Sequence, residues 1–101
     1  MKALVFSYGS LILPENLRKF SSRILCSAFV SGYDIDIIKH TEKDYYFLQL
    51  RQGISNIPGF LIETKDIESI DRWEGSRYKR IEIVCYTRNM QKQKCFAYFK
   101  A

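Results

Sequence analysis

The stretch Val5-Phe6-Ser7-Tyr8-Gly9-Ser10-Leu11 places an apolar strand directly before a tight polar turn. The apolar character of residues 2–7 predicts a strand that is buried on both faces. A glycine at such a transition lets successive backbone N–H groups point at one spot, which suits an anion or oxyanion, and Ser10 adds a hydroxyl. The alternative is an ordinary turn in which Gly9 relieves strain and Tyr8 packs in the core.

A second informative stretch, far downstream, is predicted to form a helix over residues 66–73. Asp66 can serve as the N-cap of this helix or as an anion in its first turn. Gly75 stands where a residue in the left-handed αL conformation commonly ends a helix. Both ends of the helix are therefore marked in the sequence.

Glu74 is the candidate general acid/base. Ile67, Ile70 and Glu74 are spaced i, i+3 and i+7, which places the carboxylate on the apolar, inward face of the helix. Burial and the partial negative charge at a helix C-terminus both raise the pKa of a carboxyl group there. A Glu with a raised pKa suits proton transfer near pH 7. The alternative is that Glu74 caps the helix or pairs with Arg77 or Arg80 at the surface.

Length and pattern predict one α+β domain that spans residues 1–101. A chain of this size with 47% apolar residues can bury a core without disulfides or a structural metal. A short helix is expected to begin near Pro14, and residues 51–58 are expected to form a loop. The many short strands predict a small, mostly antiparallel β-barrel, closed or partly open, with one or two helices. The strands are expected at residues 2–7, 25–30, 33–37, 45–50, 59–62, 80–87 and 94–99.

The cysteines and the single histidine argue against a disulfide framework and against zinc. Cys26, Cys85 and Cys95 are odd in number and form no Cys-x-x-Cys pair, and His40 lies in a polar segment that is expected to face solvent. This cysteine usage is typical of a reducing compartment, so a cytoplasmic location is expected.

Charge and hydropathy argue against two further classes of partner, although a basic accessory protein that binds nucleic acid stays open as a third, weaker option. The net charge of +5 is spread along the chain, which favours a solvated surface over a nucleic-acid site. No apolar run approaches the roughly 20 residues that span a bilayer, so no membrane partner is expected. A glycine-rich phosphate loop is also absent, and nucleotide binding is not indicated.

Taken together, the Tyr8-Gly9-Ser10-Leu11 turn and the downstream Asp71-x-x-Glu74-Gly75 and Tyr78-x-Arg80 patterns resemble the γ-glutamylcyclotransferase-like (AIG2-like) superfamily. The resemblance implies a small barrel with helices, in agreement with the strand pattern. It implies that the turn cradles the α-carboxylate and amine end of a γ-glutamyl group, and that Glu74 is the catalytic acid/base. It assigns substrate binding to Tyr8, Gly9, Ser10, Leu11, Tyr78, Arg80 and Tyr98.

The reaction implied by the resemblance is the cyclisation of a γ-glutamyl amine or dipeptide to 5-oxoproline, with release of the free amine. The α-amine of the substrate attacks its own γ-carbonyl, so no metal or organic cofactor is needed. The leaving group is open among γ-glutamyl-lysine, other γ-glutamyl amines and γ-glutamyl dipeptides. The alternative function is a non-catalytic small-molecule-binding or interaction module on the same fold.

Overall fold

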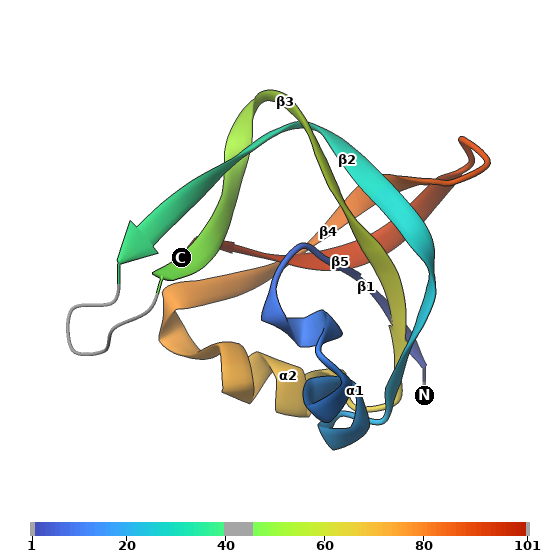
Figure 1. The fold of residues 1–101 in the computed structure, drawn as a ribbon, viewed down its shortest axis with the longest axis vertical. Coiled ribbons are helices and arrows are strands. Elements are labelled where there is room, and N and C mark those ends of the chain that lie inside the picture. The colour runs from blue at the N-terminus through green and yellow to red at the C-terminus, as the bar shows by residue number, and fades with distance from the viewer. Residues whose placement is uncertain (1, 40–45, 101) are drawn as a thin grey trace.

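The computed structural model describes residues 2–39 and 46–100, so that His40 lies outside the described part of the chain. Figure 1 shows a curled β-sheet with two helices packed against one side of it. The elements follow in the order β1 (Ala3–Ser7), η1 (Ser10–Ile12), α1 (Pro14–Lys19), β2 (Ser22–Lys39), β3 (Tyr46–Thr64), α2 (Ile67–Glu74), η2 (Gly75–Arg77), β4 (Tyr78–Thr87) and β5 (Lys92–Lys100).

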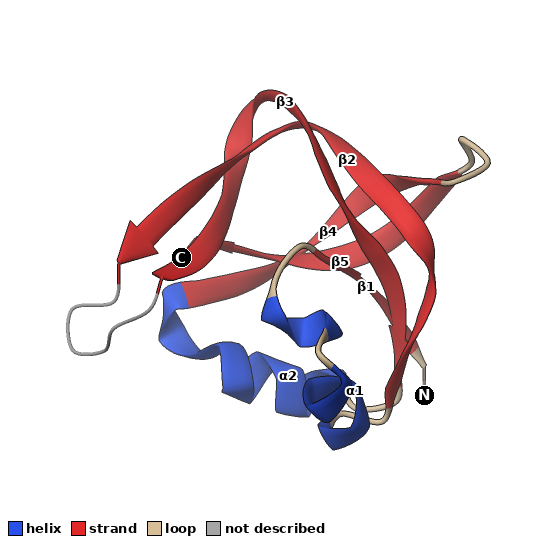
Figure 2. Cartoon of the chain, viewed as in Figure 1, coloured by secondary structure: helices blue, strands red, loops and turns tan. Residues whose placement is uncertain are grey.

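The strands close into a barrel in the order β1-β3-β2-β4-β5, as Figure 2 shows in red. Four of the neighbouring pairs are antiparallel, whereas β5 runs parallel to β1 and to β3. The fold is therefore an α+β closed barrel with a mixed sheet, and the predicted barrel is confirmed. Two 3-10 turns, η1 and η2, accompany the two α-helices.

The predicted loop over residues 51–58 is wrong, because β3 runs through it without interruption. The strands expected at residues 25–30 and 33–37 are likewise one strand, β2, which pairs with β3 along most of its length. The turn-forming residues serve a bulge instead: Tyr33 faces both Gln52 and Ser55 in the register. Gly53 belongs to this bulge and lies so close to the Asp34 carboxylate that a Cβ would clash with it.

The apolar side chains form two cores, one inside the barrel and one between the barrel and the helices. The inner core includes Phe6, Leu50 and Phe99. The outer core joins β1 and β5 to the helices, and Ile70 of α2 is fully buried in it. Because alternate residues of β1 point to opposite faces, Val5 joins the outer core while Phe6 joins the inner one.

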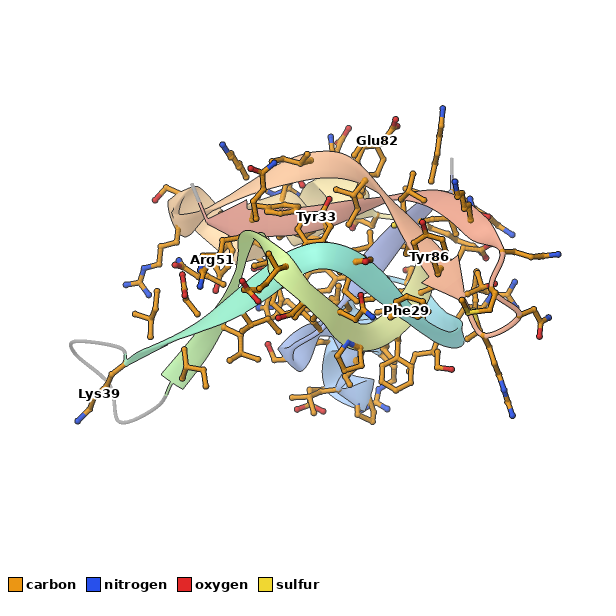
Figure 3. All side chains as sticks on the ribbon, turned by 90° about the horizontal axis from the view of Figure 1, so that it is seen from above. Phe29, Tyr33, Lys39, Arg51, Glu82 and Tyr86 are labelled. Atoms are coloured by element: carbon orange, nitrogen blue, oxygen red, sulfur yellow. The ribbon has the colours of Figure 1, made fainter. Side chains whose placement is uncertain are left out.

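Outside the barrel, Phe29 and Tyr86 stack with ring centroids 5.2 Å apart, and Figure 3 shows them together where β2 meets β4. The stack lies on the rung where these two strands pair, since Phe29 and Tyr86 are Cα partners in the register. Aromatic cross-strand pairs of this kind stabilise a sheet by roughly 0.2–1 kcal/mol. The stack therefore supports the short β2–β4 pairing that closes the barrel.

Helix α2 forms largely where its sequence predicts. The Asp66 carboxylate accepts a hydrogen bond from the Ser69 backbone N–H at 3.3 Å, which confirms it as the N-cap. Gly75 follows the helix with φ +75° and ψ −167°, so its φ is positive as expected but its ψ lies outside the αL region. Helix α1 begins at Pro14, also as expected. None of the helices in residues 2–39 and 46–100 is long and apolar enough to cross a membrane.

Candidate active site

A cavity of about 470 Å³ lies where the end of β1 meets the end of α2. We refer to it as the central cavity. Its volume falls within the roughly 300–1,000 Å³ that is usual for small-molecule sites. Most of the residues singled out in the sequence line it, namely Tyr8, Gly9, Ser10, Leu11, Glu74, Tyr78 and Tyr98, together with Val5, Phe6, Ser7 and Leu48.

Glu74 is the ionisable group of this cavity that titrates near neutral pH. It is the last residue of α2, and burial raises the pKa of its carboxyl from 4.5 to about 7. Burial, which disfavours the charged form, is the cause of the raised pKa. Arg80, one of the two surface partners considered for Glu74, instead contacts Asp71 at 3.3 Å. The carboxylate is therefore poised both to accept and to donate a proton at pH 7.

The turn after β1 presents backbone to the cavity. The backbone hydrogen bonds of η1 begin with the Ile12 N–H, which donates to the Gly9 carbonyl, so the N–H groups of Ser10 and Leu11 are not used within the turn. Gly9 has φ −141° and ψ −145°, which does not require glycine. A Cβ on Gly9 would nevertheless meet no atom within 4 Å. The missing side chain thus leaves open space through which a ligand can approach the backbone.

The hydroxyl of Tyr8 forms hydrogen bonds with the backbone of two barrel strands. It donates to the Tyr98 carbonyl at 2.8 Å and accepts from the Leu50 N–H at 3.0 Å. These bonds join β1 to β5 and β3, and burial raises the pKa of Tyr8 well above its usual value. Tyr8 therefore stays neutral and shapes the wall of the cavity.

Tyr78 and Tyr98 line the same cavity, and both hydroxyls also have protein acceptors. Tyr78 donates to the Leu48 carbonyl at 2.9 Å, and Tyr98 donates to the Asp71 carboxylate at 2.6 Å. Burial raises the pKa of Tyr98, and the hydrogen bond to Asp71 raises it further. Neither hydroxyl is placed as a free proton donor, so both are suited to positioning a ligand.

Arg80 does not line the central cavity. Its guanidinium contacts the Asp71 carboxylate and lies 4.8 Å from the centre of the Phe96 ring. Asp71 thus connects Arg80 to Tyr98, one step behind the cavity wall. Asp71 is the first residue of the Asp-x-x-Glu pattern that ends at Glu74, but it was not predicted to be a site residue.

No metal centre is indicated in the described ranges, where no three His, Cys, Asp or Glu side chains form a group that could hold an ion. The described cysteines are free thiols. Cys85 and Cys95 are buried within the inner core of the barrel and do not line the central cavity.

The half-buried Glu74 and the Tyr8–Leu11 turn line one cavity of a small closed barrel, as the resemblance of the sequence motifs to the cyclotransferase-like proteins implies. The family model described as "Gamma-glutamyl cyclotransferase, AIG2-like" matches residues 5–101, and the chain belongs to this family.

Solved structures share the fold. A structure described as a gamma-glutamyl cyclotransferase is 20% identical, with a TM-score of 0.87 over 100% of this chain and 68% of that one. An uncharacterised protein from Homo sapiens is 21% identical, with a TM-score of 0.83 over 99% and 67%. An AIG2-like protein from Mus musculus is 18% identical, with a TM-score of 0.73 over 99% and 78%. No curated protein matches the sequence significantly.

Proposed function

We propose that the chain is a γ-glutamylcyclotransferase-type enzyme that converts the γ-glutamyl group of a γ-glutamyl amine or dipeptide to 5-oxoproline. Family membership supports this class of activity. The observation that carries the proposal is the Glu74 carboxyl, with a pKa of about 7, in a cavity bordered by the Gly9–Leu11 turn.

The reaction needs little from the protein beyond folding the substrate and moving protons. The α-amine attacks the γ-carbonyl carbon, a C–N bond forms, and the original amide C–N bond breaks. Because the attack is intramolecular, holding the substrate in a bent conformation supplies much of the acceleration. The α-ammonium nitrogen loses two protons as it becomes the ring N–H of 5-oxoproline. Glu74 takes one of them and returns it to the departing nitrogen, so that it ends in its starting state; the other goes to solvent, from which the released amine takes up a proton at neutral pH.

The anionic end of the substrate is assigned to the turn after β1. The N–H groups of Ser10 and Leu11 and the Ser10 hydroxyl are the donors available there. Tyr78 and Tyr98 also line the cavity, and their rings are assigned to the methylene groups of the glutamyl chain. This assignment requires no cation in the central cavity, and none of its lining residues is basic.

The test is release of 5-oxoproline from a panel of γ-glutamyl amines and dipeptides by the wild type, Glu74→Gln and Glu68→Gln. Glu68 lies in the first turn of the same helix and is exposed, so its substitution is the matched control. We expect Glu74→Gln to lose about a hundred- to ten-thousand-fold in rate, as for other general acid/base residues, and Glu68→Gln to keep it. Equal rates for the wild type and Glu74→Gln would contradict the proposal. Binding without turnover by the wild type would favour the non-catalytic binding module.

A further inference from the structure

The carboxylate of Asp71 contacts two side chains at once, one from β4 and one from β5. Its Oδ1 accepts a hydrogen bond from the Tyr98 hydroxyl at 2.6 Å, and its Oδ2 lies 3.3 Å from Nη1 of Arg80. Because Asp71 forms an ion pair with Arg80, it offers Tyr98 a charged acceptor, and hydrogen bonds from a hydroxyl to a charged carboxylate are short and strong. One side chain of α2 therefore binds both neighbours.

Asp71 and Glu74 are neighbours on the surface of α2, because the Cβ atoms of residues at i and i+3 of a helix lie about 5–6 Å apart. Tyr98 lines the central cavity together with Glu74. Burial is the largest cause of the raised pKa of Tyr98, the hydrogen bond to Asp71 follows, and the charge of Glu74 adds to both. The Tyr98 hydroxyl is therefore close to two carboxylates, and its single proton can be donated to only one of them.

The other titratable groups around Glu74 have different partners. The Tyr8 hydroxyl of β1 donates to the Tyr98 carbonyl, and the Tyr78 hydroxyl of β4 donates to a backbone carbonyl of β3. Arg77 of η2 lines a neighbouring cavity of about 440 Å³ that Glu74 also borders. The acceptors of Tyr8 and Tyr78 are backbone carbonyls of strands, which the sheet holds in place. The acceptor of Tyr98 is a side chain, so a substitution can release its proton.

The direction of the Tyr98 hydrogen bond affects how tightly Glu74 holds its own proton. Burial raises the pKa of Glu74 to about 7, a value that suits a group which both accepts and donates a proton near neutral pH. A hydrogen bond donated to an ionised carboxylate favours the charged form and lowers the pKa of that group. A Tyr98 hydroxyl turned towards Glu74 would therefore oppose the effect of burial.

We propose that Asp71 is a positioning residue for Glu74: it holds the Tyr98 hydroxyl and the Arg80 guanidinium as its own partners, so that neither donates to the proposed acid/base. This inference rests on the proposed function and deepens it by assigning a task to a residue that does not line the central cavity. Asp71 transfers no proton and touches no substrate. It acts through Tyr98, and Arg80 keeps Asp71 charged.

The experiment is an NMR titration of the Glu74 side-chain carboxyl in 13C-labelled protein, with Glu74→Gln used to identify its resonance. The variant Asp71→Ala/Arg80→Gln removes the acceptor together with its cationic partner, so the net charge of the protein is unchanged. We expect the Glu74 midpoint, about 7 in the wild type, to fall by about one pH unit, as for a hydrogen bond to a charged group. Adding Tyr98→Phe should restore the wild-type midpoint, because the hydroxyl that turns towards Glu74 is then absent.

Two single substitutions complete the test. Tyr98→Phe alone should leave the Glu74 midpoint unchanged, since the hydroxyl it removes donates to Asp71; this variant decides the question even if the Asp71 variants prove unfolded by urea denaturation. Glu68→Gln removes an exposed carboxylate of the same helix and should also leave the midpoint unchanged. The inference is overturned by an unchanged midpoint in Asp71→Ala/Arg80→Gln, by a lowered midpoint that persists when Tyr98→Phe is added, or by a raised midpoint in Tyr98→Phe alone.

The pH–rate profile then connects the hydroxyl to the proposed reaction. With the γ-glutamyl substrate that the wild type turns over fastest, the acid limb of kcat/KM should move to lower pH in Asp71→Ala/Arg80→Gln by as much as the NMR midpoint, because kcat/KM reports the groups of the unliganded protein. A limb that stays in place while the NMR midpoint moves would refute the role of Asp71 in catalysis. A wild type that releases no 5-oxoproline would refute the proposed function, whereas the titration would still decide whether Asp71 holds Tyr98 away from Glu74.

Discussion

Replacing Glu74 with Gln should change how the stability of the protein depends on pH, independently of any substrate. Burial raises the pKa of the Glu74 carboxyl to about 7, and in the unfolded chain the value returns to about 4.5. Between these two values the folded state holds a proton that the unfolded state releases. The free energy of unfolding therefore falls as pH rises through this range, because a raised folded-state pKa stabilises the protein only while the group is protonated.

The magnitude follows from the two pKa values. A difference of one pKa unit corresponds to about 1.4 kcal/mol, so ionising Glu74 costs the folded state roughly 3 kcal/mol by pH 8. This cost is large for a chain of 101 residues, whose whole stability is expected to be on the order of 5–10 kcal/mol. Glutamine is nearly isosteric and carries no charge, so the variant avoids the cost at every pH.

The assay is urea unfolding of the wild type, Glu74→Gln and Glu68→Gln at intervals from pH 4.5 to 8.5. The difference in unfolding free energy between Glu74→Gln and the wild type should grow by roughly 3 kcal/mol across this range, in favour of the variant. The same difference for Glu68→Gln should stay nearly constant, because Glu68 is exposed. Parallel curves for the wild type and Glu74→Gln would refute the argument that burial, rather than a charged partner, governs this carboxyl.

Three further predictions follow from the same site. In a pH–rate profile, kcat/KM should fall below about pH 7 with the Glu74 pKa, since the ionised carboxylate is the form that accepts the substrate's proton; a flat profile from pH 5 to 8 would exclude this role. Gly9→Ala should keep its unfolding free energy within about 0.5 kcal/mol, because a Cβ meets no atom within 4 Å, but should raise KM about tenfold by occupying ligand space; an unchanged KM would place the ligand elsewhere. Tyr8→Phe should lose about 1–3 kcal/mol in urea unfolding, because the Tyr98 carbonyl and the Leu50 N–H lose a partner, and a neutral effect would contradict the structural role of this hydroxyl.

The fold was predictable where local signals agree with the tertiary structure. Asp66 caps α2 and Pro14 opens α1 because both act through backbone geometry that is encoded within a few residues. The continuity of β3 was not predictable, since Gly53 and its polar neighbours are typical of a loop. They belong to a strand here because β2 supplies the pairing and the bulge at Tyr33 absorbs the irregularity. This pairing joins residues that are far apart in the sequence, so a local sequence pattern cannot predict it.

The site was predictable to the extent that helix periodicity and strand order determine it. Ile70 and Glu74 share one face of α2, so burial of the isoleucine brings the carboxylate inward. The location of Arg80 could not be predicted in the same way. Arg80 is the Cα partner of Tyr98 in the β4–β5 register, yet Asp71 of α2 contacts both side chains and keeps the arginine behind the cavity wall. The contact depends on how the helix lies across the strands.

The tyrosines of the central cavity explain why one carboxylate is enough for the proposed chemistry. The hydroxyls of Tyr8, Tyr78 and Tyr98 all donate to protein acceptors, and burial keeps the pKa of Tyr8 and Tyr98 above their usual values. Among the described groups that line the cavity, Glu74 is therefore the one that can exchange a proton near pH 7. An intermolecular acyl transfer would commonly need a separate activated nucleophile. A substrate that carries its own amine as the nucleophile needs a single residue that transfers protons. In this cavity Glu74 is that residue.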